Sequence, residues 1–311
     1  VKYLVMKEKV VVFGGSGFLG SHVADMLSDE GYHVVIFDLT KSKYLRDNQK
    51  MIVGNILNRN EVRKTVAGAK YVYHFAAIAD IKKAQDNPID TVNINVLSTV
   101  KLLDACIKNK IKRFIYGSTI YVYSEHGSFY RSTKQASELI IENYQKIYNL
   151  NYTILRYGSL YGPRANHFNF INKIIKQALK ERKIVREGNG QELREYIHIK
   201  DAARASVEIL SDNFINANIM ITGTKSMRIR DLLAMIKEIF NEKIEIEYTN
   251  KVLEAHYNIT PYTFKPKVAK KYQLHYYYDL GQGILEQIYT VYEQLLQKGD
   301  IEEDNFLTKE D

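Results

Sequence analysis

The residue pair Tyr130 and Lys134 has a spacing that could serve proton transfer. Side chains at positions i and i+4 of a helix lie on one face, so the phenol and the ammonium would be neighbours. Tyrosine ordinarily titrates near ~10, and a lysine ammonium beside it favours the phenolate. We therefore expect Lys134 to lower the pKa of Tyr130, which could then take a proton from an alcohol near neutral pH.

Spacing alone does not select this pair, because the pattern Y-x-x-x-K also occurs at Tyr3/Lys7 and at Tyr196/Lys200. Tyr3 precedes the first predicted strand. The alternating run that starts at Tyr196 is typical of a strand, which would point Lys200 elsewhere. Tyr130 instead opens a predicted helix, so its position in the chain favours it.

Two hydroxyl residues, Ser118 and Thr119, end the strand-like run that precedes the helix of Tyr130. In an open parallel sheet, reactive groups gather at the carboxyl ends of the strands. We expect Ser118 or Thr119 to hydrogen-bond a substrate hydroxyl beside Tyr130. The alternative is that both are turn residues and Tyr130 is an interfacial aromatic, and a neighbouring cofactor site favours the catalytic interpretation.

A glycine-rich turn predicts that cofactor site. A strand-like run leads into GGSGFLG at 14–20, a helix-like segment follows, and a second strand ends at Asp38. Bare positions at Gly14, Gly17 and Gly20 would let backbone N–H groups approach a pyrophosphate at the helix N-terminus. Asp38 could accept hydrogen bonds from an adenosine ribose and would repel a 2′-phosphate, which favours NAD over NADP. The alternative is a turn that merely packs helix against strand.

Strands and helices alternate along the chain, which predicts an α/β fold with a doubly wound parallel sheet, a Rossmann architecture. We expect an NAD-binding domain at 1–158, a smaller substrate domain at 159–311, and a return of part of 196–222 to the first sheet. The acidic segment 298–311 is expected to be a frayed tail. The predicted strands are 9–13, 32–38, 51–53, 71–75, 113–116, 151–156, 219–221 and 244–246, and the predicted helices are 21–30, 95–109, 130–148, 170–182, 200–210, 229–240 and 283–296.

The composition is that of an ordinary globular protein, with 45% hydrophobic and 26% charged residues among 311. No apolar run approaches the ~20 residues that span a bilayer, and no secretion signal is present, so we expect a cytoplasmic protein. Cys106 is the only cysteine and the eight histidines form no close pairs, so we expect neither an internal disulfide nor a structural metal. The net charge of +8 is spread along the chain, which favours an anionic small molecule over nucleic acid.

Several ordered motifs resemble the extended short-chain dehydrogenase/reductase family, in particular its NAD-dependent sugar-nucleotide epimerases and dehydratases. They are GGSGFLG, Asp38, HFAA at 74–77, GSTIYVY at 117–123, YRSTK at 130–134, LRYGSLYGP at 155–163 and GNGQELREYIH at 188–198. The resemblance implies that Thr119 takes the catalytic Ser/Thr position, Tyr130 is the base, and Lys134 binds the nicotinamide ribose. The NAD contacts that it implies, together with those of the glycine turn, are Gly14, Ser16, Gly17, Phe18, Leu19, Gly20, Asp38, Asn55, Ile56, Phe75, Ala76, Ala77, Asn95, Tyr130, Lys134 and Tyr157.

The resemblance also implies a site for the substrate nucleotide. Arg194 matches an arginine that grips the pyrophosphate, a task that suits a guanidinium fork. Glu187 could accept hydrogen bonds from guanine, which hints at a GDP-linked rather than a UDP-linked sugar, and a solvent-facing glutamate is the alternative. The expected substrate contacts are Ser118, Thr119, Ser159, Arg186, Glu187 and Arg194.

Departures from the family pattern narrow the expected reaction. The 4,6-dehydratases place an Asp-Glu pair directly after the catalytic threonine, and the decarboxylases carry a glutamate beside the hydroxyl residue. Ile120 and Tyr121 follow Thr119 here, so dehydration is disfavoured. We expect a nucleotide-sugar 4-epimerase, with two alternatives: a C4 dehydrogenase that releases its 4-keto product, and a non-catalytic NAD-binding scaffold. By resemblance we expect a homodimer through 95–109 and 130–148.

Overall fold

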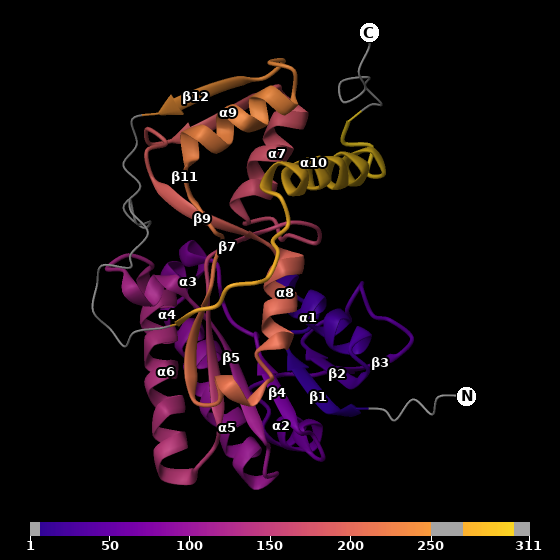
Figure 1. Cartoon of the computed structure of the whole chain (residues 1–311), viewed down its shortest axis with the longest axis vertical. Helices are drawn as coiled ribbons and strands as arrows, with labels where there is room; N and C mark the ends of the chain where they lie inside the picture. Colours follow the sequence, from indigo (N-terminus) through magenta and orange to yellow (C-terminus); the bar gives the residue numbers. More distant parts are fainter. Residues whose placement is uncertain (1–6, 250–269, 302–311) are drawn as a thin grey trace. The chain divides into compact units, whose positions relative to one another are not determined.

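The computed structural model describes residues 7–249 and 270–301. It divides into two compact units (Figure 1). Of the described residues, the first unit contains 7–157, 202–221 and 270–274, and the second contains 158–201, 222–249 and 275–301. The chain therefore returns to the first unit twice. The return at 202–221 falls within the predicted interval 196–222, and the return at 270–274 has no counterpart in the sequence-based expectation.

An eight-stranded sheet, parallel throughout, forms the centre of the first unit, with the order β13-β10-β6-β5-β4-β1-β2-β3. The order changes direction between β1 and β4, and ligands of such sheets bind at the carboxyl ends of the strands at this switch point. The predicted doubly wound sheet is confirmed. Its strands are β1 (Lys7–Phe13), β2 (Tyr32–Asp38), β3 (Gln49–Val53), β4 (Tyr71–His74), β5 (Arg113–Thr119), β6 (Tyr152–Tyr157), β10 (Ala217–Ile221) and β13 (Lys270–Lys271).

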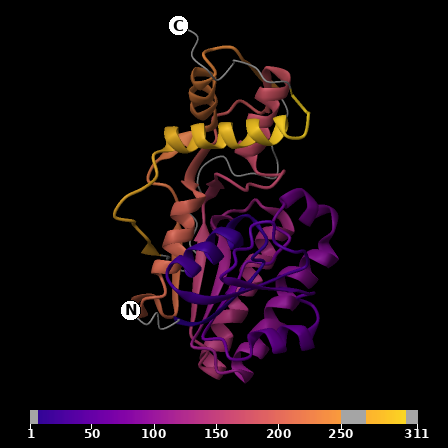
Figure 2. The same ribbon diagram turned by 90° about the vertical axis from the view of Figure 1, so that its right-hand side faces the viewer.

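Helices cover both faces of this sheet (Figure 2). On one face, Val62 of α2, Leu102 of α5 and Ile141 of α6 join a hydrophobic cluster with alternate residues of the strands. On the other face, the Tyr73 hydroxyl of β4 donates to the Ser206 carbonyl of α8 at 2.7 Å. The helices of this unit are α1 (Phe18–Asp29), α2 (Arg59–Val66), α3 (Ile81–Asp86), α4 (Pro88–Val92), α5 (Ser98–Lys108), α6 (Ser128–Tyr148) and most of α8 (Ile199–Glu208), with the 3-10 turns η2 (Ile120–Tyr123) and η3 (Asp212–Phe214).

The helix predicted at 95–109 is longer and less regular than expected. The helical run begins with α4, passes through a π-helical segment, η1 (Asn93–Leu97), and continues as α5. Pro88 suits the start of α4 because a first-turn N–H has no intrahelical partner. Single π turns are rare and frequently lie at functional sites, and this one carries Asn95.

The second unit has its own core. Side chains of α7, α9 and α10 pack in one cluster with Tyr161, Ile184 and Tyr196 of the strands. Two small sheets have the orders β11-β9-β7 and β12-β8. The elements are β7 (Ser159–Tyr161), α7 (Phe170–Glu181), β8 (Lys183–Glu187), β9 (Leu193–His198), β11 (Ser226–Arg228), α9 (Ile229–Ile239), β12 (Glu245–Thr249) and α10 (Leu280–Leu296).

Two further expectations concern the C-terminal tail and membrane-spanning segments. Of the tail predicted at 298–311, residues 302–311 lie outside the described part of the chain. No helix among the described residues has the length and apolar character needed to cross a membrane.

Candidate active site

The glycine turn packs so closely that side chains are excluded from it. A Cβ on Gly14, whose φ is +82°, would lie 2.4 Å from the Ala76 nitrogen, and a Cβ on Gly20 would lie 2.2 Å from the Gly14 carbonyl oxygen. Helix α1 begins after Gly17, which has no side chain to cap the first amides. First-turn N–H groups and the helix dipole together suit a phosphate group. The predicted phosphate-binding turn therefore has the required shape.

Asp38 lies against this turn. Its Oδ2 accepts from the Ser16 backbone N–H at 3.0 Å, and its Oδ1 accepts from the Thr40 N–H at 3.5 Å. The Ser16 hydroxyl in turn donates to the Thr40 carbonyl at 2.8 Å. The structure thus brings together the turn and the carboxylate that the sequence placed 18 residues after Gly20.

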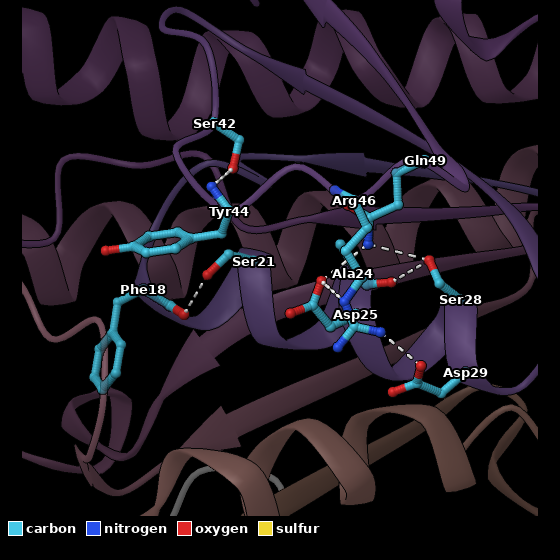
Figure 3. Close-up of polar contacts among 10 residues, drawn as sticks. All are labelled: Phe18, Ser21, Ala24, Asp25, Ser28, Asp29, Ser42, Tyr44, Arg46 and Gln49. Carbon is cyan, nitrogen blue, oxygen red and sulfur yellow. Dashed lines mark hydrogen bonds and ion pairs between the residues drawn. The ribbon is translucent and has the colours of Figure 1, made fainter.

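The loop that follows Asp38 is fixed on α1 by a polar cluster (Figure 3). Gln49 donates to Asp25 at 3.0 Å and to Ser28 at 3.1 Å. Arg46 forms ion pairs with Asp25 at 3.1 Å and with Asp29 at 2.6 Å. These contacts hold the loop and therefore the position of Asp38 beside the turn. No motif in the sequence predicts them.

Aromatic rings line the neighbouring strand ends. The Phe75 and Phe13 backbones are joined by a 2.8 Å hydrogen bond, and the Phe75 ring lies edge-on to that of Tyr157 at 6.4 Å. A Cβ on Gly117 would lie 2.6 Å from the Phe75 ring, so glycine is required there. The Tyr157 hydroxyl is hydrogen-bonded to Ser206 at 2.6 Å.

Three predicted cofactor residues have side chains engaged within the protein. Asn95 accepts from the Ile78 N–H at 2.8 Å and donates to the Ile78 carbonyl and to Thr133, so it fixes the loop after β4. Ile56 is buried in the core cluster. Asn55 is exposed, and its Oδ1 accepts from the Leu57 N–H at 2.9 Å.

Thr119, Tyr130 and Lys134 meet at the carboxyl end of β5 and the start of α6. The Thr119 side chain is near enough to the Tyr130 hydroxyl to lower the pKa of Tyr130 by hydrogen bonding. Lys134 is 3% exposed, its Nζ donates to the Gly117 carbonyl at 2.7 Å, and it lies 5.9 Å from the centroid of the Tyr130 ring. The three predicted catalytic side chains are therefore within reach of one another.

The acid–base properties differ from the expectation that Lys134 lowers the pKa of Tyr130. Burial raises the pKa of Tyr130 to about 12, and the hydrogen bond with Thr119 opposes that rise. Burial lowers the pKa of Lys134 to about 7, and the charge of Glu138 opposes that fall. The spacing predicts adjacency correctly, but it carries no information about desolvation, which penalises both charged forms.

Ser118 does not share the environment of Thr119. Successive residues of a strand face opposite ways, and the Ser118 hydroxyl donates to the buried Glu138 carboxylate at 2.5 Å. Glu138 also accepts from Arg156 at 3.0 Å and 2.6 Å. Of the two candidate hydroxyls, Thr119 is thus the one beside Tyr130, and the sequence analysis missed the buried Glu138–Arg156 pair.

The remaining expected substrate residues lie in the second unit. Arg186, whose side chain is 12% exposed, donates to Glu192 at 2.9 Å and lies over the Phe170 ring. Burial lowers the pKa of Arg186, and the nearby Arg194 charge lowers it further, so the two guanidinium groups share one environment. Two further members of the set are Ser159 at the start of β7, which is partly buried, and Glu187 at the end of β8, which is exposed.

The part of the chain described here has no group of three or more His, Cys, Asp or Glu side chains arranged to hold a metal ion.

Comparison with known proteins identifies the family. Residues 10–220 match the model of the NAD-dependent epimerase/dehydratase family. The UDP-N-acetyl-α-D-glucosaminuronate decarboxylase of Bacillus cytotoxicus is 29% identical, over 91% of this chain and 97% of that relative.

Two solved structures have a similar fold. The UDP-N-acetylglucosamine 4-epimerase of Methanobrevibacter ruminantium, in complex with UDP-N-acetylmuramic acid, has a TM-score of 0.80 and 26% identity, covering 93% of this chain and 100% of that one. The UDP-glucuronic acid 4-epimerase of Bacillus cereus, in complex with UDP-glucuronic acid and NAD, has a TM-score of 0.80 and 26% identity, covering 92% and 99%. Because the family model matches more than half of the chain, the chain belongs to the NAD-dependent epimerase/dehydratase family.

Proposed function

We propose that the protein is an NAD-dependent 4-epimerase of a UDP-linked sugar. The observation that carries this proposal is the grouping of Thr119, Tyr130 and Lys134 at the carboxyl end of a parallel strand, where Thr119 lowers the pKa of Tyr130 and Lys134 donates to the neighbouring Gly117 carbonyl. Such a group can remove a proton from a secondary alcohol and give it back. The matched 4-epimerases support the choice of reaction and of nucleotide.

The residues of the first unit fit NAD. The glycine turn would hold the pyrophosphate, since a Cβ at Gly14 or Gly20 would collide with backbone. Asp38 would accept from the adenosine ribose and Lys134 would donate to the nicotinamide ribose. When bound there, NAD supplies reversible hydride acceptance from a carbinol carbon.

Residues of the chain remove the proton from the substrate and return it. Tyr130 takes the proton of the C4 hydroxyl while Thr119 hydrogen-bonds that oxygen and fixes its orientation. Lys134, as an ammonium, stabilises the phenolate form of Tyr130 by charge. After the 4-keto sugar has rotated within the site, Tyr130 returns the proton to the C4 oxygen as hydride returns to the opposite face of C4, and the opposite stereoisomer results.

The surroundings of Thr119 disfavour elimination and decarboxylation, although the matched relatives include a decarboxylase. Ile120 is 1% exposed and apolar, and the Tyr121 ring packs edge-on against Tyr130 at 6.5 Å. Glu138 is bound to Ser118 and Arg156 beneath the site. Neither Ile120 nor Tyr121 offers a carboxylate beside Thr119, and Glu138 is occupied by Ser118 and Arg156, so the described part of the site has no free carboxylate of the kind that loss of water uses as a general acid.

The second unit would bind the nucleotide. The side chain of Arg186 is 12% exposed, pairs with Glu192 and lies near the Arg194 charge, and its Nε has no hydrogen-bond partner among the described residues, so a pyrophosphate could satisfy that donor. UDP is favoured over GDP because the matched enzymes act on UDP-sugars and because Glu187, the residue that could recognise guanine, is exposed.

The test is incubation of the purified protein and NAD with UDP-glucose, UDP-N-acetylglucosamine and UDP-glucuronic acid, plus one GDP-sugar. Products are identified by proton NMR while absorbance at 340 nm is followed. A C4 stereoisomer without accumulating NADH is expected, and Tyr130→Phe should abolish it. Stoichiometric NADH with a 4-keto product would instead establish the C4 dehydrogenase, and a silent panel with intact NAD binding would leave the scaffold interpretation.

We also propose a homodimer through α4, α5 and α6, which pack together in the first unit. Large apolar side chains on α4, η1 and α6 are between 42% and 76% exposed, and exposed apolar side chains on neighbouring elements are typical of protein interfaces. These side chains are Ile89, Leu97, Leu139, Ile147 and Tyr148.

Sedimentation velocity tests the dimer with Leu139→Glu, which should yield monomers. Leu39→Glu is the control, because Leu39 is exposed by the same 60% but lies on the β2–β3 loop. A wild-type monomer at micromolar concentration would contradict the dimer.

A further inference from the structure

A buried ion pair lies directly beneath the Thr119, Tyr130 and Lys134 group. Glu138 and Arg156 are 6% and 2% exposed, and Arg156 binds both carboxylate oxygens, at 3.0 Å and 2.6 Å. Arg156 also donates to the Tyr123 hydroxyl at 2.5 Å and lies over that ring. Ser118 donates to Glu138 at 2.5 Å. The Glu138 carboxylate therefore accepts three hydrogen bonds, from Ser118 of β5 and from Arg156 of β6.

Glu138 and Ser118 lie close in the sequence to residues of the proposed reaction. Glu138 lies one helical turn after Lys134 on α6, and Ser118 lies between Gly117, which binds Lys134, and Thr119. The Glu138 hydrogen bonds thus join α6, which carries Tyr130 and Lys134, to the end of β5, which carries Thr119. The pair fixes the helix and the strand in one register.

The pair is too costly to be explained by stability alone. Burying two charges carries a desolvation penalty that can exceed their mutual attraction, and well-packed apolar residues often replace such pairs without loss. Good geometry and full hydrogen bonding offset the cost here, but they do not explain why a charge is retained. Lys134 supplies an explanation, because it is a buried cation whose charged form needs a nearby carboxylate.

We propose that Glu138 is a positioning residue for the proposed reaction: its carboxylate, held by Arg156 and Ser118, keeps Lys134 in its ammonium form beside Tyr130. Because Lys134 acts on Tyr130, this role rests on the proposed function. Glu138 itself does not contact the reacting hydroxyl.

Among the described groups around Lys134, Glu138 is the one whose negative charge can stabilise the ammonium form of Lys134. On α6 itself Lys134 faces Tyr130 and Glu138, and from β5 it faces the Tyr116 ring at 4.6 Å and the Gly117 carbonyl. From β4 it faces His74, whose burial lowers its pKa to about 3 and so keeps it neutral. Burial lowers the pKa of Lys134 to about 7, and the charge that opposes this fall is that of Glu138.

The direction in which the pKa of Lys134 should move follows from the sign of the Glu138 charge. Glu138→Gln removes the opposing charge, so the pKa of Lys134 should fall further below its ordinary value. Less ammonium is then present at neutral pH, so the alkaline limb of the activity profile, where Lys134 loses its charge, should move to lower pH and the plateau should be reduced. A role confined to packing would reduce activity without moving that limb.

The direct test is a titration of Lys134 by NMR in protein carrying ¹³Cε-labelled lysine, with the resonance assigned by Lys134→Arg. A midpoint near 7 is expected in the wild type, and a midpoint lower by about one pH unit is expected in Glu138→Gln. An unchanged midpoint would overturn the proposal. This measurement needs no substrate, so its outcome is independent of whether the protein is an epimerase.

Two further variants guard against misfolding and general perturbation. Glu142→Gln makes the same change in an equally buried glutamate one turn farther along α6, and it should leave the midpoint in place. If Glu138→Gln fails to fold because Arg156 is left unpaired, the double variant Glu138→Gln/Arg156→Met is compared with Arg156→Met alone, because these two differ only in the charge at position 138, and the double variant should have the lower midpoint. With a working substrate, the pH profile of kcat then separates charge from packing.

Discussion

Two arginines, Arg156 in the first unit and Arg186 in the second, differ in how their charge is balanced. Arg156 is buried, is bound at both carboxylate oxygens of Glu138 and also donates to Tyr123. Arg186, whose side chain is 12% exposed, pairs with Glu192, and its Nε has no hydrogen-bond partner among the described residues. The first arrangement satisfies its own charge, while the second leaves a guanidinium donor that an anion could satisfy.

This difference indicates a separate function for each unit. A network that satisfies itself fixes the geometry of the groups around it, as catalysis requires. A guanidinium donor that has no partner in the described part of the protein favours an anion from outside, as nucleotide binding requires. Changes in the first unit should therefore alter chemistry or cofactor binding, and changes in the second should alter substrate binding.

The largest expected effect is that of Tyr130→Phe, which removes the hydroxyl bound to Thr119. We expect kcat to fall by about 10³-fold because the general base is lost. NADH binding, measured by fluorescence titration, should stay within a few-fold of wild type. A variant that keeps a tenth of wild-type kcat would break the assignment of chemistry to this residue.

The next effect concerns the glycine turn. In Gly14→Ala, the Cβ would lie 2.4 Å from the Ala76 nitrogen, so we expect NADH binding to weaken by about 100-fold, equivalent to roughly 2.7 kcal/mol. Gly31→Ala is a matched control, because Gly31 has φ +83° against +82° at Gly14 but no atom within 4 Å of the added Cβ. Equal losses in both variants would attribute the effect to backbone strain rather than to the close packing of the turn.

A smaller effect is expected in the second unit. Arg186→Gln should raise KM for the sugar nucleotide by about tenfold to thirtyfold through loss of a charged hydrogen bond, with kcat changed less than threefold. The control is Lys237→Gln, which removes another cation of the same unit, paired with Glu242 at 2.9 Å. If kcat fell as much as KM rose, the division of labour between the units would be incorrect.

The smallest effect is that of Asp38→Asn. The amide oxygen can still accept from the Ser16 N–H, but the negative charge that repels a 2′-phosphate is removed. We expect the preference for NAD over NADP to shrink by about tenfold, measured from the two dissociation constants. An unchanged preference would show that the polar loop of Figure 3, not this charge, selects the cofactor.

The sequence predicts those features that depend on local pattern. The glycine turn, the acidic end of β2 and the Tyr130–Lys134 spacing are all local, and the structure brings each to one end of the sheet. Non-local features escape such reasoning. The Glu138–Arg156 pair joins residues 18 positions apart, and the return of 270–274 to the first sheet rests on a strand of two residues.

Local pattern also fails where burial decides the outcome. The spacing of Tyr130 and Lys134 suggests a lowered phenol pKa, but desolvation raises it to about 12. Ser118 and Thr119 are equivalent as sequence, and only the facing of β5 gives Ser118 to Glu138 and leaves Thr119 beside Tyr130.

The central claim is that hydride leaves C4 and returns to C4 within one site. The most direct test takes the UDP-sugar that proves active in the panel above and labels it with deuterium at C4. The product is then analysed by mass spectrometry and NMR. We predict a C4 stereoisomer that retains the deuterium at C4, with no net NADH. Loss of the deuterium to water, or its release in NADH beside a 4-keto product, would contradict the account.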